Sequence, residues 1–129
     1  MITLHIDGRR VEDIASFYEE VNRVFMQGED WRLGESLDAL DDLLYGGYGA
    51  LHRHESARVV WEEHELSAAA LGLRATREQL LTKLATPQRY DQDLLRRRLE
   101  QLDAEGGPTY FETVLEIFGS HPGIELVLA

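Results

Sequence analysis

The fold of this chain is indicated first by residues 34–45, which read Gly-Glu-Ser-Leu-Asp-Ala-Leu-Asp-Asp-Leu-Leu-Tyr. Ser36 is a typical helix N-cap and glycines follow at positions 46 and 47, so we expect a short helix between them. At about 100° per residue, the leucines of this helix share one face. The opposite face carries Asp38, Asp41, Asp42 and Tyr45. The segment therefore predicts a helix that is buried on its leucine side and strongly acidic on its outer side.

Strands and helices alternate on both sides of this helix. Hydrophobic patterning predicts strands at residues 2–6, 57–61 and 124–128. The second strand, Ala-Arg-Val-Val-Trp, is mostly apolar, and we expect it to be buried on both faces. Helical patterns occupy residues 13–28, 36–45, 62–71, 76–103 with a break at Thr86-Pro87, and 109–118.

Strands that are separated by helical crossovers pair in parallel. The sequence therefore predicts an α/β fold of three layers, in which helices pack on an open, three-stranded parallel sheet. We expect residues 1–129 to form a single domain.

The net charge of −11 arises from 13 basic and 24 acidic residues, and it is unevenly distributed. Residues 73–106 hold seven bases and six acids, a net charge of +1, so the remainder carries −12. Residues 29–42 contain six acids and one base. This charge disfavours binding to nucleic acid, which depends on clustered lysine and arginine, and it favours a basic partner.

Several other classes are excluded by composition. The chain has no cysteine, and therefore no disulfide framework, iron–sulfur cluster or thiol chemistry. The sequence contains no long apolar run and no basic region ahead of one, so we expect neither a membrane span nor a secretory signal.

Catalytic and metal-binding motifs are incomplete. His64-Glu65 lacks the second histidine that a zinc protease needs four residues on, because position 68 is Ala. The run of residues 34–38 resembles a serine elbow, but Asp38 stands where that turn requires glycine. Paired carboxylates can perform acid–base work, yet no nucleophile or cofactor motif accompanies them. We expect no enzyme activity, no metal and no cofactor.

The run of residues 34–44, with Gly46 after it, closely resembles the signature loop and helix of the barstar family, which inhibits barnase-like bacterial ribonucleases. Residues 2–8 and 59–61 resemble the first two strands of that family, and residues 112–118 and 124–128 resemble its last helix and strand. The resemblance covers residues 1–72 and 107–129. It makes the fold barstar-like and residues 73–106 an additional helical insertion.

The resemblance implies a cytoplasmic bacterial antitoxin or immunity protein. Its acidic loop and helix would mimic RNA phosphates and block the active site of a basic secreted ribonuclease. Asp42 would occupy the central phosphate position, Asp38 would be a second anchor, and Glu112 would be a third acidic contact. A monomer is favoured.

Two departures from the family pattern concern the partner. Arg32-Leu33 replaces an aromatic pair, and Asp41 stands where a tryptophan is usual. Aromatic contacts are then expected from Trp31, Tyr45 and Tyr48 instead. The alternative is a barstar-fold interaction module that binds a different basic toxin or protein. The candidate partner-binding residues are Trp31, Glu35, Asp38, Asp41, Asp42, Tyr45, Tyr48 and Glu112.

Overall fold

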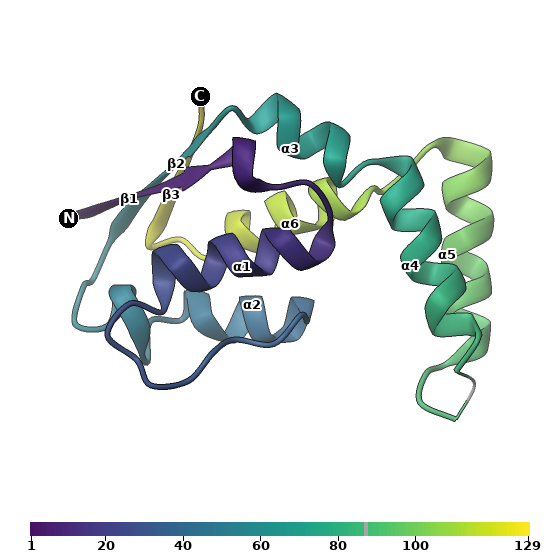
Figure 1. Cartoon of the computed structure of the whole chain (residues 1–129), viewed down its shortest axis with the longest axis horizontal. Coiled ribbons are helices and arrows are strands. Elements are labelled where there is room, and N and C mark those ends of the chain that lie inside the picture. The colour runs from purple at the N-terminus through teal and green to yellow at the C-terminus, as the bar shows by residue number, and fades with distance from the viewer. Residues whose placement is uncertain (87) are drawn as a thin grey trace.

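The computed structural model describes residues 1–86 and 88–129 (Figure 1). The strands are β1 (Ile2–Asp7), β2 (Ala57–Glu62) and β3 (Ile124–Leu128). The α-helices are α1 (Ile14–Phe25), α2 (Leu37–Leu44), α3 (His64–Ala70), α4 (Leu73–Leu84), α5 (Gln92–Glu105) and α6 (Tyr110–Gly119). Two 3₁₀ turns, η1 (Gly8–Arg10) and η2 (Gly49–Leu51), complete the described elements. Among the described residues, no helix is long and apolar enough to cross a membrane.

The three strands form one parallel sheet in the order β1-β2-β3. Ala57 of β2 lies opposite Ile2 on one side and Ile124 on the other. The predicted three-stranded parallel sheet is therefore confirmed.

The prediction that the second strand is buried on both faces is wrong. Val59 and Trp61 are fully buried, but Val60 between them is only half-buried, and Arg58 before them and Glu62 after them are exposed. Arg58 pairs with Glu125 of β3 at 3.0 Å on the outer face. In the part of the chain that the structure describes, helices cover one face of the sheet, so every second position along β2 meets solvent and tolerates charge.

Helices α1, α6 and α2 stack on the covered face in two layers (Figure 1). Helices α1 and α6 pack against the sheet, and α2 packs against α6 on the side away from the strands. The Trp61 side chain of β2 lies at the centre, stacked on Phe17 of α1 with ring centroids 5.7 Å apart. The sheet, the α1 and α6 pair, and α2 thus form three layers.

Helices α4 and α5 form a hairpin that stands beside this core (Figure 1). Leu80, Leu95 and Leu102 are buried between the two helices in a cluster separate from the main core. The hairpin is anchored at its base, where the Tyr110 backbone N–H donates to the Thr76 hydroxyl at 2.7 Å. The predicted break falls between α4 and α5, and Pro87 lies outside the described residues. That residues 73–106 are an insertion remains a prediction.

Candidate protein-binding site

Helix α2 presents the two faces that the sequence predicts. The Ser36 hydroxyl caps it by accepting from the Ala39 N–H at 3.3 Å. Leu40 and Leu43 are completely buried. Asp38 and Asp42 are both exposed, one helical turn apart. Two carboxylates are thus held outward by a helix whose other side is locked in the core.

Asp41 points in a different direction from the other two aspartates. Its Oδ1 lies 2.7 Å from Nε2 of His121, which follows the last turn of α6. The Asp41 side chain is 40% exposed and that of His121 only 7%. Asp41 therefore has a partner within the protein, unlike Asp38 and Asp42, for which no ion pair is found among the described residues. His121 is 80 residues away in sequence, and no pattern around it signals the pairing.

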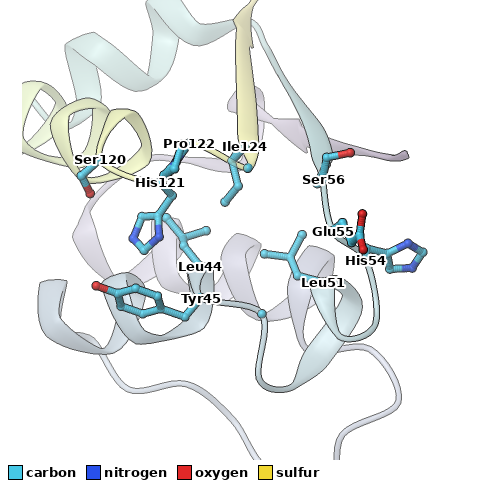
Figure 2. A pocket seen from close by; sticks show the side chains of 13 residues that line it. Leu44, Tyr45, Leu51, His54, Glu55, Ser56, Ser120, His121, Pro122 and Ile124 are labelled. Atoms are coloured by element: carbon cyan, nitrogen blue, oxygen red, sulfur yellow. The ribbon is translucent and has the colours of Figure 1, made fainter.

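Tyr45 completes this corner of the site. It is the C-cap of α2, so the helix ends one residue earlier than expected. Figure 2 shows its ring beside the His121 imidazole, edge-on with centroids 4.6 Å apart. The two residues border a cavity of about 220 Å³ at the amino ends of β2 and β3. Tyr45 remains 75% exposed, and so presents an aromatic surface beside the aspartates.

A second aromatic surface lies near Asp42. Trp31 and Tyr48 pack on each other with ring centroids 4.9 Å apart. Partial burial raises the pKa of Tyr48, and the negative charge of Asp42 raises it further. Trp31 is 44% exposed. The structure thus brings Asp42, Tyr48 and Trp31 together, three residues that the sequence nominates separately.

The loop between α1 and α2 is held by one buried side chain. The Asn22 carboxamide accepts from the Leu33 N–H at 2.6 Å, and its Nδ2 donates to the Leu33 carbonyl at 3.0 Å. Asn22 also donates to the Tyr18 carbonyl within α1. Both backbone groups of Leu33 are satisfied, as buried polar groups must be. The segment that leads into Gly34 and Glu35 is therefore fixed before any partner arrives.

Gly49 supports the same loop from the other side. Its N–H donates to Glu29 at 3.0 Å. Its backbone φ is +73°, a conformation that residues with a side chain rarely adopt. A Cβ at this position would lie 2.3 Å from the Phe25 carbonyl oxygen. Glycine is thus required where the chain passes the end of α1.

Glu35 lies exposed just before α2, close to two buried tyrosines. The hydroxyls of Tyr18 and Tyr110 are 2.6 Å apart. Burial raises the pKa of both phenols, and the charge of Glu35 adds to that shift. Glu35 is therefore an outward carboxylate beside a pair of neutral phenols.

Glu112 lies in the first turn of α6. Its carboxylate accepts from the Thr109 N–H at 2.9 Å and forms a capping box there. Glu116, one turn further along α6, lines the same cavity as Leu37 of α2. The contact of Glu112 with a partner stays a prediction.

Within the described part of the chain, no group of three or more His, Cys, Asp or Glu side chains gathers in a way that could hold a metal ion. His52 and His54 are exposed. The arrangement consists instead of outward carboxylates and aromatic rings on a preformed scaffold. Such a surface is suited to a cationic protein partner.

Comparison with protein families finds a matching family model. The family model described as barstar (barnase inhibitor) matches residues 1–104, from β1 into the end of α5. The chain therefore belongs to the barstar family, a family of ribonuclease inhibitors that are not enzymes. The matched range includes every nominated site residue except Glu112. A search of curated proteins finds no match.

Proposed function

We propose that this protein inhibits a basic, barnase-like bacterial ribonuclease by inserting α2 and the preceding loop into its active site. The single observation that carries the proposal is the pair of exposed carboxylates on α2, Asp38 and Asp42, held outward by a buried leucine face. A ribonuclease active site must attract phosphates, so a fixed array of carboxylates competes for the same cationic groups.

Preorganisation supports this role. Asn22 and Gly49 hold the loop, and Ser36 caps the helix, so little conformational entropy is lost on binding. Trp31 and Tyr48 lie beside Asp42, where flat aromatic surface can exclude water from a charge pair. Glu112 on α6 would be a further acidic contact, and Asp41, which pairs with His121, keeps 40% of its side chain exposed.

The biological setting follows from the proposed activity. An inhibitor of a secreted ribonuclease protects the producing bacterium when it acts in the cytoplasm, as an antitoxin or immunity protein. Its net charge of −11 speeds encounter with a basic enzyme and disfavours RNA itself. We propose a monomer that binds one protein partner.

A second candidate function is binding to a different basic toxin or protein. The observation that favours it is that Asp41, which stands where the family usually has a tryptophan, pairs with His121. A changed contact surface on an unchanged scaffold fits a changed partner.

Inhibition assays separate the two candidates. Barnase and other secreted ribonucleases of its type would be titrated with the purified protein, with cleavage of a fluorogenic RNA as the readout. We expect stoichiometric inhibition of at least one ribonuclease, and protection of cells that co-express it. Binding to another basic protein without inhibition of any ribonuclease would overturn the first candidate and favour the second.

A further inference from the structure

A cleft of about 460 Å³ separates the start of α2 from the α4–α5 hairpin. One wall carries two acids, Glu35 and Asp38, and the other carries two bases, Lys83 of α4 and Arg98 of α5. Tyr90, between α4 and α5, also lines the cleft. The acidic wall thus belongs to the proposed inhibitory surface, and the basic wall stands directly beside it.

The two walls do not neutralise each other. Within residues 1–86 and 88–129, no ion pair joins Glu35 or Asp38 to Lys83 or Arg98. The Lys83 ammonium instead lies over the Tyr90 ring, 5.4 Å from its centroid. All four charges therefore face the cleft and remain available to a molecule that enters it.

The basic wall belongs to two helices that are packed against each other and joined to α6. Arg77 of α4 forms an ion pair with Asp103 of α5, and the two helices share a leucine cluster. Thr76 holds the base of α4 to α6. Lys83 and Arg98 therefore stand on a packed helix pair and line the same cleft as Asp38.

A partner that is basic across its whole contact surface would meet like charges at this wall. Like charges that are brought together at an interface disfavour binding, and charges that alternate in sign fix the register of a complex. The basic wall is therefore matched by a partner that carries negative charge next to its cationic site.

We propose that the α4–α5 hairpin is a specificity element, which receives an acidic segment of the ribonuclease in this cleft while Asp38 and Asp42 engage its cationic centre. This inference rests on the proposed function and adds the charge pattern of the partner. Lys83 and Arg98 would bind the acidic segment, and Tyr90 would pack against it.

The test is a charge reversal on the basic wall. Lys83→Glu/Arg98→Glu would be compared with Arg74→Glu/Arg97→Glu, which makes the same change in net charge at exposed hairpin positions outside the cleft. The probe is the ribonuclease of the barnase-type panel that the unaltered protein inhibits most strongly. We expect the inhibition constant of the cleft variant to rise about tenfold or more at low salt, and that of the control to change by less than about threefold.

Circular dichroism and thermal unfolding would verify that both variants fold. If the reversal disturbs the hairpin, Lys83→Gln/Arg98→Gln must show a smaller change in the same direction. Hydrogen exchange adds a measurement without substitution, because amides of α4 and α5 that border the cleft should gain protection in the complex.

Different outcomes would overturn the specificity role of the hairpin and the proposed ribonuclease inhibition. An unchanged or lower inhibition constant for the cleft variant, while Asp38→Ala/Asp42→Ala abolishes inhibition, would overturn the inference and leave the proposed function standing. No inhibition of any ribonuclease by the unaltered protein would overturn the proposed function, and the inference with it.

Discussion

The Nε2 atom of His121 lies 2.7 Å from the Asp41 carboxylate and joins the end of α6 to the middle of α2. One of three neighbouring aspartates thereby becomes an internal tie, and the other two stay exposed. The tie also positions Tyr45, whose ring edge meets the same imidazole. The acidic helix is thus fixed from the core by leucines and from one flank by a histidine.

Replacement of His121 should loosen this flank. His121→Ala removes a buried ring and leaves Asp41 without its partner, so we expect a loss of about 1–2 kcal/mol in the free energy of unfolding. Urea denaturation measures this loss. The control is His52→Ala, at an exposed loop position, which should have little effect. Equal stabilities of the two variants would contradict the structural role of the pair.

Replacement of Asn22 should affect stability and binding together. In Asn22→Ala both backbone groups of Leu33 lose their partners inside the protein, which should cost about 2–4 kcal/mol. The loop before α2 would then have to be ordered on binding, so inhibition should weaken by about tenfold. Gln27→Ala, which removes an exposed side-chain bond to the Arg23 carbonyl, is the matched control. An Asn22→Ala protein with unaltered inhibition would show that preorganisation of this loop is unimportant.

Glycine should be irreplaceable at position 49 and replaceable at position 47. Gly49→Ala combines a left-handed backbone with a Cβ contact of 2.3 Å to the Phe25 carbonyl oxygen, and should destabilise the protein by more than about 2 kcal/mol. Gly47 has no positive φ and nothing within 4 Å of an added Cβ, so Gly47→Ala should be nearly neutral. Thermal unfolding of both variants checks the contrast, which would fail if they melted alike.

Stability should fall at alkaline pH because of the buried tyrosine pair. Burial raises the pKa of Tyr18 and Tyr110 above the usual 10.0, so above that pH the unfolded chain releases protons that the folded protein keeps. The free energy of unfolding is therefore at its full value below pH 10 and decreases as the pH rises beyond it. Tyr18→Phe should make this decrease shallower, and Tyr90→Phe, at an exposed position, should not. Denaturant titrations from pH 8 to 11 give the slopes.

Local patterns account for much of the fold. The alternation of Ile2, Leu4 and Ile6 predicts β1, and Ser36 with the following leucines predicts α2, because caps and periodicity act within a few residues. The run Val59-Val60-Trp61 misleads, since an apolar stretch does not reveal which faces of the sheet the helices cover. The exposed Arg58 and Glu62 on either side of it are the signal for one solvent face.

The site is less predictable than the fold. The outward positions of Asp38 and Asp42 follow from helical periodicity alone. The Asp41–His121 pair and the Trp31–Tyr48 pair join different elements, and contacts of that kind depend on tertiary packing that no local pattern encodes. The cleft between Asp38 and the α4–α5 hairpin is likewise visible only once the hairpin is placed.

The central claim is that Asp38 and Asp42 bind the cationic centre of a ribonuclease. Isothermal titration calorimetry of Asp38→Ala/Asp42→Ala with the inhibited ribonuclease tests it most directly, against Glu65→Ala/Glu100→Ala, which removes two exposed carboxylates from α3 and α5. We predict that affinity falls by about 100-fold or more for the α2 variant and by less than about threefold for the control, with both proteins folded. Equal affinities for the two variants would contradict the claim.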